Sequence, residues 1–122
     1  MAPDAEPIVQ AWLSKGLTSI RVTTAGVPKD PAYPLVTVSR VGSWDSGDPD
    51  VDAVDRPVLA VKSWARTAPE ARRIASEVAR LMRRLPEAAF VAGCKETNRY
   101  QSQDGDVAQY VGTYQLLVTR VR

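Results

Sequence analysis

The 122-residue chain contains no histidine and only one cysteine, Cys94. Histidine is the commonest general base and metal ligand, so its absence removes most hydrolytic sites and, with one cysteine, most zinc sites. A single cysteine cannot form an internal disulfide, and the fold must therefore depend on its core. The phosphate-loop, dinucleotide-binding and nucleophile-elbow motifs are missing as well. We therefore expect no enzyme, no cofactor and no metal site.

Long apolar runs are also missing. No stretch approaches the 18 residues of a membrane span, and the N-terminus lacks the basic start and apolar core of a signal peptide. The composition is that of a globular protein, with 44% hydrophobic and 25% charged residues. The length fits one domain over residues 1–122, made in the cytoplasm and without a membrane partner.

Apolar spacing predicts two helices. The first covers residues 5–17, with Asp4 at its N-cap and Gly16 at its C-cap. The second begins at Thr67, which forms a capping box with Glu70, and ends at Pro86. Strands are expected over residues 19–23, 35–41, 58–65, 89–100 and 107–121. This order predicts an α+β fold, a mostly antiparallel sheet with two helices packed on one face.

Three smaller features concern packing. The strand over residues 107–121 is apolar on both faces, so it is expected to be covered on both sides or to lie at an interface. Trp12, Trp64 and Cys94 fall in apolar patterns and are interpreted as core residues.

The outer face of the second helix is basic. It carries one acid, Glu77, among five arginines: Arg72, Arg73, Arg80, Arg83 and Arg84. One interpretation is an ordinary surface with an Arg73–Glu77 ion pair at i,i+4. A second is nucleic-acid binding, which the net charge of +2 and the lack of interleaved aromatic residues disfavour. The third, which we prefer, is that this face meets an acidic segment of another copy of the chain.

Such an acidic segment lies in the loop expected over residues 42–57. It holds five aspartates, namely Asp45, Asp48, Asp50, Asp52 and Asp55. The alternate spacing of three of them resembles the start of a calcium loop, but Ala53 and Leu59 stand where glycine and glutamate are required. The remaining interpretations are a solubilising loop and a docking segment, with Trp44 as its aromatic anchor.

Three stretches resemble one family. They are Pro34–Gly42, Val58–Thr67 with the helix that begins at Glu70 and Ala71, and Arg99–Tyr100 through Tyr110–Leu116. In these the chain is similar to the tail terminator proteins of long-tailed bacteriophages, also called tail completion or head–tail joining proteins.

The resemblance implies an α/β fold and a ring of six subunits at the junction of tail and neck in the virion. Such a ring caps the tail tube, stops its polymerisation and joins it to the head connector or stopper protein. DNA passes through its lumen without specific binding. The acidic loop and the turn with Asp104 and Asp106 would project toward the tube or the lumen, where carboxylates repel phosphates.

Two alternatives to this function stay open. One is another phage neck component, such as a stopper or head-completion protein, or a structural ring of a related contractile device. The other is a small nucleic-acid-binding domain that uses the arginine helix.

Overall fold

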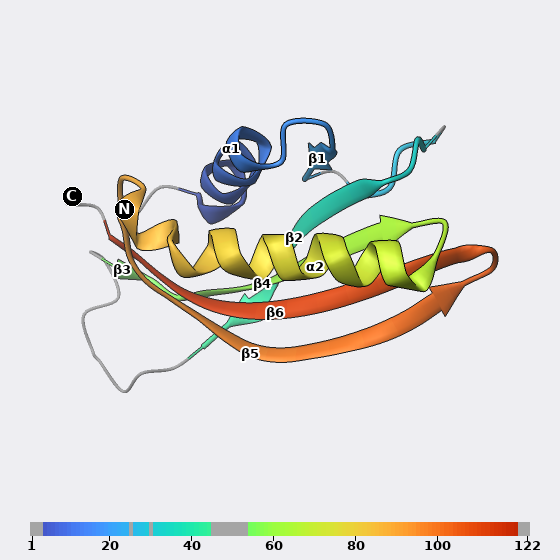
Figure 1. Ribbon diagram of the computed structural model, residues 1–122. Coiled ribbons are helices and arrows are strands. Elements are labelled where there is room, and N and C mark those ends of the chain that lie inside the picture. The colour runs from blue at the N-terminus through green and yellow to red at the C-terminus, as the bar shows by residue number, and fades with distance from the viewer. Residues whose placement is uncertain (1–3, 25, 30, 45–53, 120–122) are drawn as a thin grey trace.

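The computed structural model describes residues 4–24, 26–29, 31–44 and 54–119. The helical elements are α1 (Ala5–Gly16), α2 (Ala68–Arg83) and a short 3₁₀ helix, η1 (Leu85–Glu87). The strands are β1 (Arg21–Thr23), β2 (Leu35–Ser43), β3 (Val54–Asp55), β4 (Pro57–Ala65), β5 (Val91–Asp104) and β6 (Val107–Thr119). The fold is α+β with a mostly antiparallel sheet, as the sequence predicts (Figure 1). No helix within the described ranges is long and apolar enough to cross a membrane.

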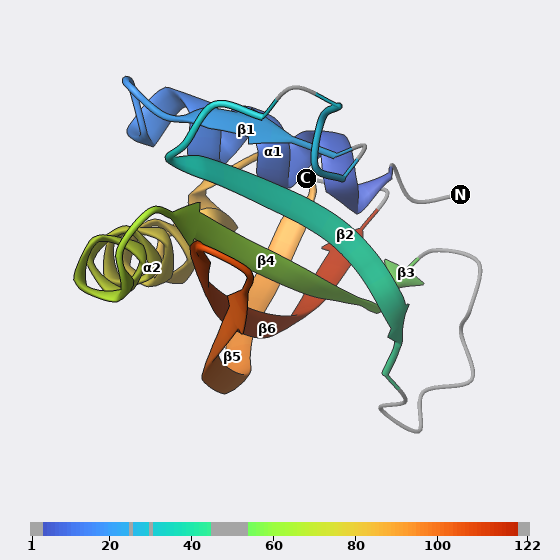
Figure 2. The ribbon, with the colours of Figure 1, turned by 90° about the vertical axis from the view of Figure 1, so that its right-hand side faces the viewer.

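The sheet is built around β6, the last strand of the chain. Strand β6 pairs with β3 and β4 along one side and with β5 along the other, and every one of these pairings is antiparallel. Strand β2 pairs antiparallel with β4, and the short β1 lies parallel to β2 at the edge. The sheet is strongly twisted, so that β2 and β4 cross the direction of β5 in Figure 2. Its two edges are therefore β1 and the much longer β5.

Both helices pack on one face of the sheet around a single core. Val9 and Leu13 of α1, Ile74 and Met82 of α2 and Leu116 of β6 are all almost fully buried in it. None of the described helices covers the other face, yet Val111 and Trp64 are buried there too. The prediction that Trp64 is a core residue is thus confirmed. The second face of β6 is covered in part, since Val111 is buried and most of the other side chains on that face are half-buried.

The helix starts form as the sequence predicts. The side chains of Asp4 and Thr67 accept hydrogen bonds of 3.3 Å from the backbone N–H groups of Glu6 and Glu70. The end of α1 differs from the prediction, because the C-cap is Leu17 and Gly16 is the last helical residue. A Cβ on Gly16 would lie 2.6 Å from the methyl groups of Leu81, so this glycine lets α1 approach α2.

The strand boundaries correct the predicted loops. Strand β2 continues to Ser43, and residues 54–55 and 57 are already strand, so the loop expected over 42–57 is shorter. The expected strands leave residues 101–106 as the connection between them, and this connection reduces to the two-residue turn Gly105–Asp106, because β5 runs to Asp104. Gly105 has φ +62°, the positive value that the first central position of a type II′ hairpin turn requires.

Candidate interaction surfaces

The arginine face of α2 is exposed along its whole length. Glu77 pairs with Arg80 rather than with Arg73, so the predicted i,i+4 pair is wrong and an i,i+3 pair takes its place. This hydrogen bond lowers the pKa of Glu77 and raises that of Arg80. Arg84 pairs in the same way with Glu87 of η1, at 3.0 Å.

Three arginines of this face remain available to a partner. Arg72, Arg73 and Arg83 make no ion pair or hydrogen bond with any residue in the described part of the chain. The helix therefore offers three guanidinium groups whose charge the chain does not neutralise by contact.

Most of the predicted acidic segment lies outside the described residues, namely Asp45, Asp48, Asp50 and Asp52. Asp55 is described and belongs to β3, where it binds Arg40 of β2 through both carboxylate oxygens, at 2.7 and 2.9 Å. The Arg40 guanidinium also donates to the Ser43 hydroxyl at 2.7 Å. The hydrogen bond to Asp55 is the main cause that raises the pKa of Arg40. The Asp55 carboxylate thus forms an ion pair between β3 and β2.

The Arg40 contacts hold a β-bulge that exposes a valine. Arg40 pairs with Leu59 and Gly42 with Val58, so Val41 is the extra residue of β2. Its side chain is 60% exposed, the highest value among the exposed large hydrophobic residues of the described chain. A bulge redirects a side chain, and here it turns an aliphatic group into solvent.

Trp44, predicted as a docking anchor, is half-buried against its own sheet. Its indole N–H donates to the Leu116 carbonyl of β6 at 2.7 Å, and its backbone N–H donates to the Arg56 carbonyl at 2.9 Å. The Arg56 guanidinium lies 5.8 Å from the ring centroid, within cation–π range.

The position of this indole has a cause in the sheet register. The register runs unchanged from Val58–Gln115 to Asp55–Val118, which places Pro57 opposite Leu116. Proline has no backbone N–H. The Trp44 indole therefore supplies a donor to the strand at the one position of β4 that has none.

The hairpin tip carries two further predicted residues. Asp104 ends β5, and its side chain lies outside the described ones; Asp106 is exposed in the turn. Figure 1 shows this tip at the end of the molecule opposite β3. The prediction that both carboxylates face a tube or lumen stays a prediction.

An apolar groove runs between α1 and the segment that follows α2. Two adjoining hollows of about 360 Å³ each share Trp12 and Lys15. The apolar wall is lined by six residues: Ile8, Ala11, Trp12, Ala88, Ala89 and Phe90. Trp12, predicted as core, is half-buried here, and its indole N–H donates to the Leu81 carbonyl at 2.8 Å.

Phe90 in this groove has an unusual backbone. Its φ is +71°, a value that bulky residues rarely adopt. The Phe90 carbonyl accepts a 2.7 Å hydrogen bond from the backbone N–H of Thr119, which holds the corner where η1 passes into β5.

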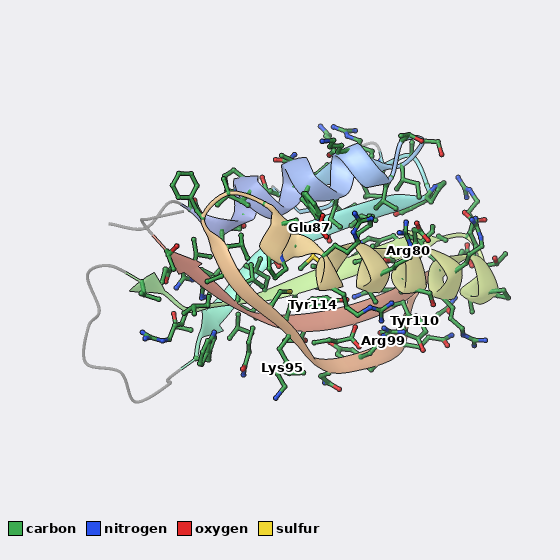
Figure 3. The ribbon with its side chains drawn as sticks, turned by 60° about the vertical axis from the view of Figure 1, so that its left-hand side comes forward. Arg80, Glu87, Lys95, Arg99, Tyr110 and Tyr114 are labelled. Atoms are coloured by element: carbon green, nitrogen blue, oxygen red, sulfur yellow. The ribbon has the colours of Figure 1, made fainter. Side chains whose placement is uncertain are left out.

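A third hollow, of about 170 Å³, lies between α2 and β5. Its lining includes Cys94, Glu96 and Tyr114, and the Tyr114 hydroxyl donates to Glu96 at 2.9 Å. Glu96 also pairs with Arg99 at 3.0 Å. Figure 3 labels Arg99 and Tyr114. Burial raises the pKa of Cys94 to about 12, and burial with the Glu96 hydrogen bond raises that of Tyr114. Both groups stay protonated near neutral pH, which suits a structural role.

Within the described ranges, no three histidine, cysteine, aspartate or glutamate residues gather as metal ligands. The surfaces outlined above offer apolar contact and charge pairing. The sequence predicts the arginine face of α2, but it predicts neither the exposure of Val41 nor the groove. A lone valine at a strand end and a few alanines beside a phenylalanine give no periodic signal.

No family model and no curated protein matches the chain. Among solved structures, it is similar to a chain of one described as "Virion of native gene transfer agent (GTA) particle". The identity is 14% over 94% of this chain and 87% of that one, with a TM-score of 0.49. So distant a likeness carries no functional conclusion.

Proposed function

We propose that the protein is a structural component of a phage-type virion that forms a ring at the end of the tail tube. The ring would stop tube growth and join the tail to the head connector, with DNA passing through its centre. The sequence resemblance to tail terminator proteins supports this role. A chain that offers surfaces for contact rather than catalytic groups is what such a role needs.

The separation of charge is the observation that carries the proposal. Arg72, Arg73 and Arg83 lie on α2 without an acidic partner in the described structure. Four aspartates gather in the sequence at residues 45–52, while the net charge is only +2. Opposite charges on separate surfaces of one chain favour head-to-tail contact between copies, which closes into a ring when the rotation allows.

The long open edge of the sheet fits the same role. Strand β5 pairs with β6 on one side, and no described strand pairs with its other side over residues 91–104. Such an edge can add a strand from a neighbour. Lys95, Glu96 and Arg99, together with two irregularities in register, protect it against uncontrolled pairing.

The first test is the assembly state of the purified chain. Light scattering at high protein concentration, with and without magnesium, should give six copies of the 13.3 kDa chain, and electron microscopy should show a central hole. Changing Asp48, Asp50 and Asp52 together to lysine should abolish the ring. A chain that stays monomeric under all conditions, and that also fails to cap growing tail tubes, would contradict the proposal.

A nucleic-acid-binding domain is the competing function, because the exposed arginine face of α2 and its C-cap also suits phosphate. It predicts salt-dependent binding to duplex DNA that is lost when Arg73, Arg80 and Arg84 are changed to alanine. The ring proposal predicts that these substitutions affect assembly, with little binding of DNA by the wild type.

A further inference from the structure

The open edge of β5 carries a small group of polar side chains at its centre. Strand β5 pairs with β6 alone, and no other described strand lies along its far side (Figure 1). An edge of 14 residues presents a row of backbone N–H and C=O groups with which a second strand can pair. Native sheets protect such edges, and the pattern of hydrogen bonds shows how this one is protected.

Two hydrogen bonds fix the direction in which the backbone groups of β6 point. The Thr119 N–H donates to the Phe90 carbonyl, on the side of β5. The Leu116 carbonyl accepts from the Trp44 indole, on the side of β4. Successive residues of an antiparallel strand point alternately to its two sides. The odd-numbered residues of β6 therefore bond to β5, and the even-numbered ones point toward β4.

The register then shows which residues of β5 face outward. Those opposite an even-numbered residue of β6 turn their N–H and C=O groups away from the sheet. Between residues 93 and 104 they are Cys94, Glu96, Arg99, Gln101 and Gln103. A regular strand offers such groups at every second residue, but the bulge at Thr97 separates Glu96 from Arg99 by three. A strand added along β5 therefore cannot stay in register across the bulge.

Arg99 is the first outward residue beyond the bulge, and its N–H already has a partner. It donates to Oδ1 of the preceding residue, Asn98, at 2.9 Å. The N–H groups of Gln101 and Gln103 have no such partner among the described side chains. Asn98 thus removes one donor from the edge, directly beside the bulge.

The bulge is held in place by contacts on both sides of it. The Thr97 hydroxyl donates to the Thr113 carbonyl of β6 at 3.3 Å. Arg99 pairs with Glu96 across the bulge at 3.0 Å, and Glu96 accepts from the Tyr114 hydroxyl of β6. Because these contacts join the residues before and after Thr97, the strand has little freedom to return to a regular spacing.

We propose that Asn98 and the Thr97 bulge close the centre of β5 to strand addition. They divide residues 93–104 into two stretches with two outward residues each, so an added strand gains few backbone hydrogen bonds. Closure keeps free copies of the chain from joining edge to edge in open-ended sheets. The other edge has a similar contact, since the Val22 carbonyl of β1 accepts from the Gln10 side chain at 3.0 Å. The inference does not rest on the proposed ring, because it concerns the single chain.

Amide hydrogen exchange of the whole chain, followed by NMR, tests the bond to Asn98. Asn98→Ala should speed exchange of the Arg99 N–H by about 5- to 10-fold, the effect of one lost hydrogen bond, and leave Gln101 unchanged. Asn98→Asp keeps Oδ1 and should keep the slow rate. Ser102→Ala is the matched control, because it removes a polar side chain just before the Gln103 N–H, which has no such bond to lose. An Arg99 rate that Asn98→Ala leaves unchanged would overturn the inference.

Sedimentation velocity tests whether the closure limits association. Asn98→Val frees the Arg99 N–H and adds a β-branched side chain, so it should give species larger than those of the wild type at the same concentration. Ser102→Val adds the same side chain on the same face of β5 without freeing an N–H, and it should sediment like the wild type.

A proline at the open end should reverse the effect. The Gln101 N–H points outward, so Gln101→Pro removes no hydrogen bond of the sheet. The double variant Asn98→Val, Gln101→Pro should return to the sedimentation pattern of the wild type. Larger species that persist in the double variant, or Asn98→Val that sediments like the wild type, would overturn the closure. Circular dichroism checks that every variant folds, and the wild type's own assembly state decides the proposed ring separately.

Discussion

The hydrogen bond between Trp44 and Leu116 allows a sharp test of how this sheet is completed. Trp44→Phe keeps an aromatic ring beside Arg56 and removes the indole N–H. The Leu116 carbonyl lies opposite Pro57, which has no N–H to offer, so it loses a 2.7 Å hydrogen bond in a partly buried place. We expect the substitution to cost about 1–2 kcal/mol, the range for a partly buried group deprived of its partner.

A second substitution should restore the missing donor. Pro57→Ala returns a backbone N–H opposite Leu116. In the wild-type background it should cost about 0.4–1 kcal/mol, because the unfolded chain gains freedom. In the Trp44→Phe background the new N–H should bond to Leu116 and offset part of the loss. The two changes should therefore be coupled by about 1 kcal/mol.

The assay is urea unfolding followed by far-UV circular dichroism, since the substitution alters tryptophan fluorescence. The four free energies of unfolding, from wild type, both single variants and the double variant, give the coupling directly. Trp44→Ala should cost about 2 kcal/mol more than Trp44→Phe, because the half-buried ring is lost as well. Trp44→Phe at wild-type stability, or a coupling near zero, would refute the role assigned to the indole.

Three further predictions concern the face of β6 that packs against α2. Cys94, whose pKa is raised to about 12, should react with a disulfide reagent at pH 8 on the order of a thousandfold more slowly in the native protein than after unfolding; equal rates would show an accessible thiolate. The pKa values of Cys94 and Tyr114 are raised in the folded protein, so as pH rises the unfolded chain loses these protons before the folded one does. The free energy of unfolding should therefore stay constant from pH 7 to about 8.5 and decline as pH rises further, less steeply in Cys94→Ala. A urea midpoint that stays constant up to pH 10.5 would contradict this. Gly112→Ala should destabilise the fold by about 1–3 kcal/mol, because a Cβ would lie 2.9 Å from the Tyr114 ring, whereas Gly93→Ala, with its nearest atom at 3.7 Å, should be tolerated; equal unfolding midpoints for the two would show that the ring moves aside.

The sequence predicted α2 best. Its cap at Thr67 and the apolar spacing from Ala71 onward are local signals that the packing does not oppose, and the structure bears them out. The α+β class follows from the order of such elements and is confirmed as well.

Strand β5 shows why other boundaries failed. Residues 101–104 are polar, and they lack the alternation of apolar and polar side chains that is typical of a half-buried strand. A strand at the edge of a sheet does not need this alternation, and backbone pairing with β6 extends β5 to Asp104. Hydrophobic periodicity therefore does not predict the end of an edge strand of this kind.

For a similar reason, the sequence predicts the arginine surface correctly but not the contacts of Trp44 and Asp55. An arginine face on a helix follows from spacing alone, and α2 indeed exposes it. The partners of Trp44 and Asp55 depend on which strands lie side by side. Trp44 reaches Leu116, 72 residues away, and no local pattern predicts such a contact.

The place of β6 in the chain order also has a consequence for biosynthesis. The strand that joins β3, β4 and β5 is made after all three of them. Until residues 107–119 have emerged, β5 has no partner and the core face of α2 has little sheet to cover. The sheet can therefore be completed only after residues 107–119 have been made, since the contacts that complete it are distant in sequence. Chains that terminate before β6 should lack a completed sheet and should be open to proteolysis.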